Sequence, residues 1–253
     1  MTDLPRHVDI RDVSMRDGLQ IEEPIPLSAK LELLAAIAAT GVREMEATAF
    51  VSPSKVPALA DAAQLAAELH HFPGIEFSAL VASPNGAKRA IAAGLDSIEY
   101  VVSASDAHSR ANVGRDTAEA TTAIADVTRI AHDQGARVEV IIATAWDCPF
   151  DGPTDPRRVI DIASAAVELG VDRIAIADTI GTTTPLRVST LIEAIRPIVD
   201  GLPLGAHFHN TRGAGLASAF AAVPVATRCT AASGASSRSR SSAATRAVAA
   251  SAP

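Results

Sequence analysis

Two histidines and one aspartate give this 253-residue chain the side chains that bind divalent metal ions. His207 and His209 are two positions apart, so on a β-strand both point to the same face of the sheet. Asp17 follows the apolar run 8–13, which predicts a first strand. The carboxylate and the imidazoles meet only if the two strands are parallel neighbours in a closed or wound sheet. The alternative is a pair of solvated surface histidines, against which the apolar approach over residues 203–206 argues.

This ligand set contains oxygen and nitrogen atoms and no thiolate. It suits a hard or borderline cation such as Mg²⁺ or Mn²⁺, with open positions for substrate oxygens, while Zn²⁺ and Fe²⁺ are chemically possible. Arg16 precedes Asp17, and beside a metal its guanidinium would stabilise an enolate or carboxylate oxygen. The amide of Gln20 is suited to hold a substrate carboxylate.

Two further acids stand at or near the ends of apolar runs. Glu46 and Thr48 alternate to one face of the run 43–50, which aims Glu46 at Arg16, because a charge inside an apolar strand needs a partner. We expect Glu46 to be either catalytic or a structural acid of the core. Asp178 ends the run 173–178, where it suits a general acid/base role or, alternatively, a helix cap. For Cys148 we expect a buried, inert thiol.

The elements that position these residues alternate along the chain. Seven apolar runs predict strands at residues 8–15, 43–50, 76–82, 97–104, 137–145, 173–178 and 204–209. Ala-rich amphipathic stretches predict helices at 28–40, 56–70, 116–134, 156–169 and 185–199. This alternation, at about 30 residues per unit, predicts parallel strands joined by helical crossovers.

A (β/α)8 barrel of TIM type and a doubly wound sheet share this alternation. The polar residues of interest follow many different strands, and a barrel gathers all strand ends around one mouth. We therefore predict an α/β fold of TIM-barrel type. About seven βα units form one catalytic domain over residues 1–223.

The composition changes abruptly after residue 223. Residues 224–253 contain ten Ala, seven Ser, four Arg and three Thr, and no acidic or aromatic residue. Such a segment buries too little apolar surface to offset the cost of ordering, so we expect disorder. It replaces the eighth βα unit and leaves open barrel edges beside the first and seventh strands. A frameshifted or misassembled C-terminus and a natural low-complexity tail are the alternative explanations.

Composition limits the partners and the compartment. The net charge of -7 argues against nucleic acid and anionic membranes as partners. Two cysteines, Cys148 and Cys229, form no disulfide framework, which favours a reducing compartment. The N-terminus lacks the apolar core of a signal peptide, and no run reaches the roughly 18 apolar residues of a membrane span. We expect a cytoplasmic protein.

Five motifs, in this order, resemble those of hydroxymethylglutaryl-CoA lyases within the DRE-TIM metallolyase family. They are MRDGLQ at 15–20, EATAFVSP at 46–53, DCPFDG at 147–152, ADTIG at 177–181 and HFHNTRG at 207–213. The resemblance covers roughly residues 6–223. Leu19 and the segment 50–53 are more similar to the lyase branch than to isopropylmalate or homocitrate synthases.

The resemblance implies a TIM barrel that binds Mg²⁺ or Mn²⁺ through Asp17, His207 and His209. It implies retro-Claisen cleavage of 3-hydroxy-3-methylglutaryl-CoA to acetoacetate and acetyl-CoA, with Arg16 stabilising the enolate. Asp178 matches the acid/base aspartate of the family, and Glu46 matches the glutamate that orients the arginine. A homodimer or larger homo-oligomer is implied as well.

The chain also departs from the family pattern. The family has an asparagine as a fourth ligand and a Gly-rich loop with a catalytic cysteine near the eighth strand, and this chain has neither. Two alternatives therefore stay open. One is an aldolase or condensing enzyme acting on another acyl-CoA or 2-oxo acid. The other is a non-catalytic truncated product, which would show neither cooperative melting nor a Mn²⁺-dependent thermal shift.

Overall fold

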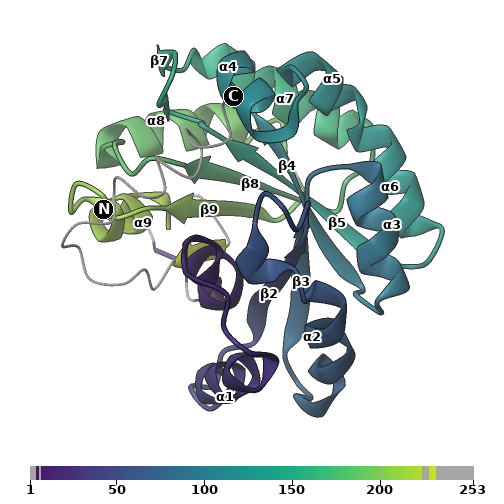
Figure 1. Cartoon of the computed structure of the whole chain (residues 1–253). Helices are drawn as coiled ribbons and strands as arrows, with labels where there is room; N and C mark the ends of the chain where they lie inside the picture. Colours follow the sequence, from purple (N-terminus) through teal and green to yellow (C-terminus); the bar gives the residue numbers. More distant parts are fainter. Residues whose placement is uncertain (1–3, 6, 200, 224–227, 232–253) are drawn as a thin grey trace.

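The computed structural model describes residues 4–5, 7–199, 201–223 and 228–231, and within them the chain forms a closed parallel barrel (Figure 1). The order of the strands around the barrel is β1-β10-β9-β8-β5-β4-β3-β2. Their bounds are β1 Asp9–Asp12, β2 Glu44–Phe50, β3 Glu76–Val81, β4 Ser97–Ser103, β5 Arg137–Ala143, β8 Arg173–Asp178, β9 Leu204–Phe208 and β10 Arg228–Ala231. The predicted TIM-barrel type is confirmed.

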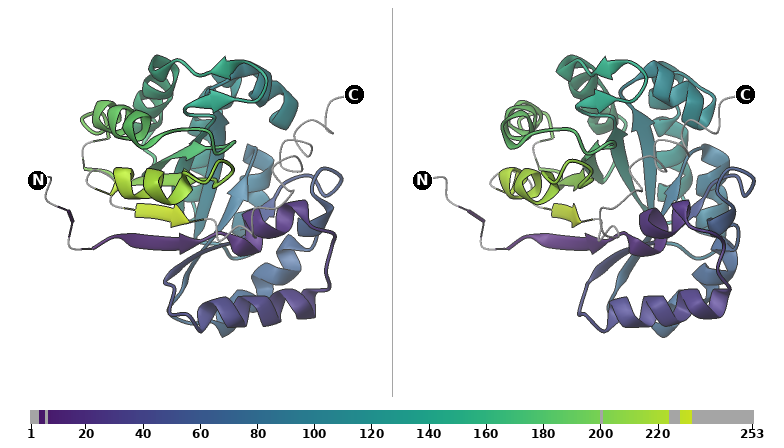
Figure 2. Two further views of the ribbon diagram at one scale, coloured as in Figure 1. Left: turned by 90° about the vertical axis from the view of Figure 1, so that its left-hand side faces the viewer. Right: turned by 60° about the vertical axis from the view of Figure 1, so that its left-hand side comes forward.

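Helices lie around the outside of the barrel (Figures 1 and 2). They are α1 Leu27–Ala38, α2 Ala62–Glu68, α3 Pro84–Ala92, α4 Asp106–Val113, α5 Thr117–Thr122, α6 Ile124–His132, α7 Pro156–Glu168, α8 Pro185–Ile195 and α9 Gly215–Ala222. A short antiparallel pair, β6 (Asp147–Cys148) and β7 (Gly152–Pro153), lies after β5. Among the described residues, no helix is long and apolar enough to cross a membrane.

The first strand is shorter than the sequence predicts. It ends at Asp12, and residues 14–18 form a single π-helical turn, η1 (Ser14–Gly18). The amides of Arg16 and Asp17 reach the carbonyl of Val13 at 3.2 and 2.7 Å. A π-turn is rare and is often found at functional sites. Here it presents two successive side chains of the RDG motif beyond the end of β1.

An eighth strand, β10, comes from the segment that the sequence analysis assigned to the tail. Its backbone pairs in parallel with β1, from Asp9↔Arg228 to Asp12↔Ala231, and with β9 on the other side. The open edges expected beside the first and seventh strands are therefore wrong. Backbone N–H and C=O groups satisfy both edges, and this pairing does not require large apolar side chains. Residues 224–227 and 232–253 lie outside the described residues, so the proposed origin of the tail stays a prediction.

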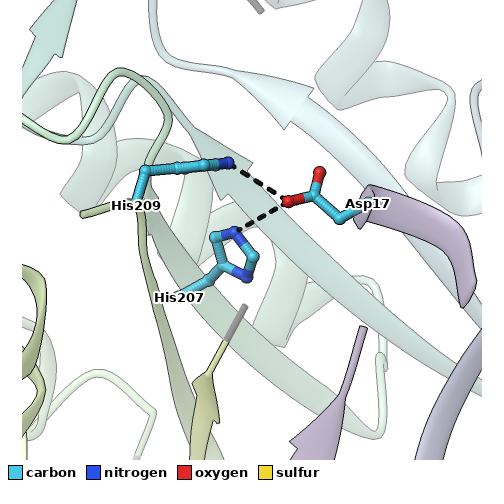
Figure 3. A group of neighbouring side chains, drawn as sticks. All are labelled: Asp17, His207 and His209. Atoms are coloured by element: carbon cyan, nitrogen blue, oxygen red, sulfur yellow. Dashed lines mark ion pairs between the residues drawn. The ribbon is translucent and has the colours of Figure 1, made fainter. Parts of the chain in front are cut away.

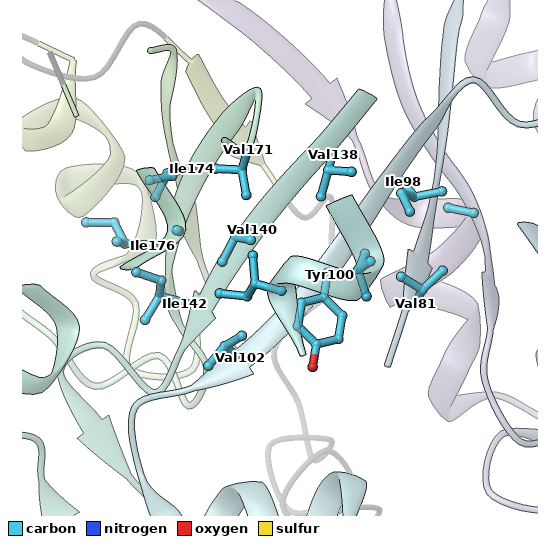
Figure 4. Packing of buried hydrophobic residues seen from close by; sticks show 14 of the residues in the cluster. Val81, Ile98, Tyr100, Val102, Val138, Val140, Ile142, Val171, Ile174 and Ile176 are labelled. Carbon is cyan, nitrogen blue, oxygen red and sulfur yellow. The ribbon is translucent and has the colours of Figure 1, made fainter. Parts of the chain in front are cut away.

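The hydrophobic core lies between the barrel and its helices, and Figure 4 shows part of it. Ile98, Tyr100 and Val102 of β4 are almost completely buried. The Tyr100 hydroxyl donates to the carbonyl of Ala120 in α5 over 3.0 Å, so this side of β4 faces the helices. Because side chains alternate along a strand, the intervening Glu99 faces the barrel interior. The bore of this barrel is accordingly polar, while its apolar packing is outside.

Acid should destabilise this fold partly through His108 of α4, which is buried next to the Ser103 hydroxyl, with 3.0 Å from Nδ1 to Oγ. Burial lowers the pKa of His108 from 6.5 to about 4. As the pH falls, His108 is therefore protonated in the unfolded chain before it is protonated in the folded one. The contribution of neutral His108 to the free energy of unfolding is complete above pH 6.5 and is lost as the pH falls toward 4. In His108→Gln, we expect the free energy of unfolding to fall by about 2 kcal/mol less between pH 7.5 and 4.5 than in the wild type.

Urea unfolding of both proteins at the two pH values measures this difference. The exposed His70 of η4 (Leu69–His71) provides a matched control, and His70→Gln should keep the wild-type loss. An equal loss in His108→Gln and the wild type would contradict a neutral, buried His108.

Candidate metal centre and active site

Asp17, His207 and His209 come together at the mouth of the barrel (Figure 3). Asp17 Oδ2 lies 3.2 Å from His209 Nε2 and 3.9 Å from His207 Nε2. The ligand atoms of the three side chains all lie within 4.8 Å of one another. The strands concerned are not neighbours, contrary to the expectation from sequence, because β10 lies between β1 and β9. The side chains still meet because Asp17 is in η1, beyond the end of β1.

The donor set fits a divalent cation. His209 Nδ1 lies 2.9 Å from the main-chain carbonyl of Asp178. A carbonyl only accepts, so Nδ1 carries the proton and Nε2 is left to face Asp17. Histidines that bind metals typically hold their other ring nitrogen in this way. In the part of the chain that the structure describes, no second group of His, Cys, Asp or Glu side chains gathers as closely.

The charge states of Asp17 and His207 agree with metal binding. Burial opposes protonation of His209, but its hydrogen bond with Asp17 raises the pKa of His209, so a cation would displace a proton from this imidazole. Burial opposes ionisation of Asp17, but Arg16, the hydrogen bond with His209 and the imidazole of His207 together hold the pKa of Asp17 well below its ordinary value. Burial, followed by repulsion from His209, lowers the pKa of His207 from 6.5 to about 3. Asp17 is therefore a carboxylate and His207 a neutral imidazole. Metal ligands need these two states.

Arg16 connects the metal-ligand group to Glu46. Its Nη1 donates to Asp17 Oδ1 over 2.8 Å, and its Nη2 lies 2.7 Å from Glu46 Oε2. Gln20 Nε2 donates to the same Asp17 oxygen over 2.9 Å. The structure thus pairs Glu46 with Arg16, as the strand pattern predicts. Arg16 is 8% exposed, and its buried Nε–H has no hydrogen-bond partner among the described residues.

Asp178 contributes through both its main chain and its side chain. Its carbonyl accepts from His209, and its carboxylate accepts from the amides of Thr182 and Thr183, each over 3.1 Å. Burial raises the pKa of Asp178, and the two amides oppose that rise. The contacts from residues just before α8 agree with the capping alternative, and the acid/base role stays a prediction. No sequence pattern indicates the carbonyl contact, because its acceptor is a main-chain atom.

The turn after Asp178 passes very close to the second histidine. Gly181 has a φ of +66°, and a Cβ there would lie 2.7 Å from the carbonyl oxygen of His209. Only glycine combines this backbone conformation with this approach. The turn that holds the Asp178 carboxylate therefore packs directly against the chain that carries His209.

Cys148 and Thr144 both follow β5 in the chain. Cys148 is 3% exposed, and its thiol donates to the Ser105 hydroxyl over 3.0 Å, in agreement with the expected buried cysteine. Thr144 is the one described residue other than glycine with a positive φ, at 54°. Its amide donates to Thr179 Oγ1 over 2.8 Å, which fastens the end of β5 to the residue after Asp178. Nothing in the sequence pattern indicated this role for Thr144.

Comparisons with known proteins agree with the geometry. The HMGL-like family model matches residues 7–230. A (R)-citramalyl-CoA lyase of Chloroflexus aurantiacus is 37% identical over 87% of this chain and 73% of its own length. A hydroxymethylglutaryl-CoA lyase of Bacillus subtilis is 31% identical over 87% of this chain and 74% of its own length.

A solved structure has the same fold. It is an HMG-CoA lyase from Acinetobacter baumannii in complex with coenzyme A and 3-methylmalate, and it superposes with a TM-score of 0.86 at 30% identity. The match covers 92% of this chain and 76% of that one. The family model, the relatives and the barrel with its Asp–His–His group lead to one conclusion. The chain belongs to the HMGL-like family and is an enzyme of the carbon–carbon lyase type.

Proposed function

We propose that this chain cleaves 3-hydroxy-3-methylglutaryl-CoA to acetoacetate and acetyl-CoA and depends on Mg²⁺ or Mn²⁺. The observation that carries the proposal is the close group of Asp17, His207 and His209 with Arg16 beside it, in a member of this family. The three side chains would hold the cation, which supplies a Lewis acid for substrate oxygens. An acyl-CoA substrate is supported by the relatives, whose printed names are those of acyl-CoA lyases.

The protein side chains would divide the reaction as follows. Asp178 takes the proton of the C3 hydroxyl, and the bond between C2 and C3 breaks as the C3 carbonyl of acetoacetate forms. The electron pair stays on the acetyl-CoA fragment as an enolate. C2 then takes up a proton from solvent to become a methyl group, and Asp178 releases the hydroxyl proton to solvent, so the protons balance. The guanidinium of Arg16 would stabilise the enolate oxygen, and Glu46 holds that guanidinium in place.

A second candidate is cleavage of citramalyl-CoA to pyruvate and acetyl-CoA. The citramalyl-CoA lyase of Chloroflexus aurantiacus is 37% identical to this chain, whereas the Bacillus subtilis hydroxymethylglutaryl-CoA lyase is 31% identical. The two substrates differ by one methylene group between the carbinol carbon and the carboxylate. The same three ligands and Arg16 therefore serve either reaction.

Separate assays with the two thioesters test both candidates. With Mn²⁺ or Mg²⁺, we expect the purified full chain to release acetoacetate from 3-hydroxy-3-methylglutaryl-CoA at about 1 s⁻¹ or faster. EDTA should abolish the rate, and added Mn²⁺ should restore it. Pyruvate from citramalyl-CoA at a much higher kcat/KM would assign the second reaction. Release of acetyl-CoA from neither substrate would contradict both and favour a non-catalytic chain.

The proposal also includes the oligomeric state of the protein and its location in the cell. We propose a homodimer or larger assembly in the cytoplasm. Sedimentation of the purified chain tests the assembly, and a monomer would contradict it.

A further inference from the structure

Four ionisable side chains meet in the bore of the barrel, one level below the metal-ligand group. Arg11 of β1 is 5% exposed, and its Nη1 donates to Glu99 Oε1 over 2.7 Å. Its Nη2 donates to Glu139 Oε2 over 2.5 Å, and its Nε lies 3.4 Å from Glu44 Oε2. The three carboxylates come from β4, β5 and β2. One guanidinium therefore reaches from β1 to strands on the other side of the bore.

The bore is shaped around these charges. Small residues face it from β8 and β9: a Cβ at Gly205 would lie 3.1 Å from the Ala175 Cβ and 3.5 Å from Glu139 Oε1. Ser78 of β3 donates a further hydrogen bond to Glu99. Bulky branched side chains usually fill the interior of a TIM barrel. Here charged groups take that space, and their burial costs free energy of desolvation.

The cluster has more carboxylates than cations. Among the described residues, the single guanidinium of Arg11 contacts the three carboxylates of Glu44, Glu99 and Glu139. The next cation toward the mouth is Arg16, which is ion-paired with Glu46. Ser78, which donates to Glu99, lies opposite Glu46 in the parallel pairing of β2 and β3, so Glu99 lies near the Glu46–Arg16 pair. Burial opposes the charge on Arg16, but Glu46, Asp17 and, to a smaller extent, Glu99 raise the pKa of its guanidinium. Glu99 is thus a second carboxylate able to attract Arg16.

We propose that Arg11 is a positioning residue of the active site, because it engages Glu99 and Glu139 and so leaves Arg16 directed toward Glu46, Asp17 and the substrate oxygen. Without Arg11, the buried Glu99 carboxylate lacks its guanidinium partner, and Arg16 is a second buried guanidinium whose charge interacts with it. A shift of Arg16 toward Glu99 would take its donors away from the mouth. The kinetic part of this inference rests on the proposed function.

A double-mutant cycle on Arg11 and Glu99 tests the inference. In Arg11→Met we expect kcat to fall about tenfold or more, with KM changed less than about twofold, because Arg16 acts on the transition state. Adding Glu99→Gln removes the competing charge and should restore most of kcat. Glu99→Gln alone should lower kcat less than Arg11→Met does. Independent effects of the two substitutions on kcat would overturn the proposal.

Arg173 provides a matched control in the same barrel. It is 8% exposed at the start of β8, and its Nη1 lies 2.6 Å from Glu76 Oε1, at the end of the barrel away from the mouth. Arg173→Met should lower the melting temperature, as Arg11→Met does, yet keep kcat within about twofold of the wild type. Equal losses of kcat in the two variants would show that Arg11 contributes only stability.

A crystal structure of the variant separates this inference from the proposed function. If the wild type cleaves neither thioester, the proposed function fails and the kinetic cycle has no signal. The direction of Arg16 in Arg11→Met still decides the inference. A guanidinium that contacts Glu99 supports it, and one that keeps its contacts with Glu46 and Asp17 overturns it. If Arg11→Met does not fold, Arg11→Met/Glu99→Gln/Glu139→Gln removes two of the buried carboxylates that have lost their guanidinium partner, and in that variant Arg16 should remain on Glu46.

Discussion

Arg16→Lys should lower kcat about 10²- to 10³-fold, while the affinity for Mn²⁺ changes little. The guanidinium contacts Asp17 through Nη1 and Glu46 through Nη2. A lysine ammonium is a single point charge, so it does not bridge two carboxylates and also present a donor in a fixed direction. The loss should therefore appear in the transition state, where negative charge develops, and leave ground-state binding nearly intact.

Steady-state kinetics together with Mn²⁺ binding followed by electron paramagnetic resonance measure this prediction. Arg129→Lys is the control, because Arg129 lies on the exposed face of α6 and forms only surface ion pairs. It should behave as the wild type does. A kcat within about threefold of the wild type in Arg16→Lys would show that positive charge alone is sufficient and that the forked geometry contributes nothing.

His209→Ala should raise the dissociation constant for Mn²⁺ by about 100-fold or more and reduce turnover by about 10³-fold at limiting metal. The substitution removes one of three ligands, and it also removes the imidazole that links Asp17 to the Asp178 carbonyl. Isothermal titration with Mn²⁺ measures the first effect without any substrate. It is therefore independent of which thioester the enzyme cleaves.

His132 offers a control of the same residue type. It lies in α6 and contacts Asp172 over 2.9 Å, with a half-exposed side chain. His132→Ala should leave Mn²⁺ binding and kcat unchanged. Unaltered Mn²⁺ binding in His209→Ala would remove this histidine from the proposed ligand set.

The positions of the main-chain elements were largely predictable, because apolar runs and amphipathic stretches reflect burial directly. All seven strands predicted from sequence occur in the structure, and Asp17, His207 and His209 lie together as their types indicated. β10 was missed because its pairing is made by backbone atoms, which leave no hydrophobic pattern. The π-turn of η1 was missed for a similar reason, since one extra residue per turn has no signature in side-chain type.

The charged bore was less accessible to sequence reasoning. Glu99 lies 88 positions after Arg11 in the chain, and Glu139 lies 128 positions after it. Each of the three looks like an isolated polar residue in an apolar run. Their common location depends on strand order and on register, which determine which side chains face one another across the barrel. Pairings that depend on the closed geometry become visible only when that geometry is known.

The place of β10 gives the metal site a thermodynamic link to the integrity of the barrel. Asp17 lies just after β1, His207 lies in β9 and His209 directly follows β9, and only β10 lies between these two strands. A cation held by all three side chains would connect the segment after β1 with β9, across the position of β10. An ion that binds only the closed form stabilises it by about 2.7 kcal/mol at 100 times its dissociation constant. Loading of the metal and closure of the barrel would then favour one another.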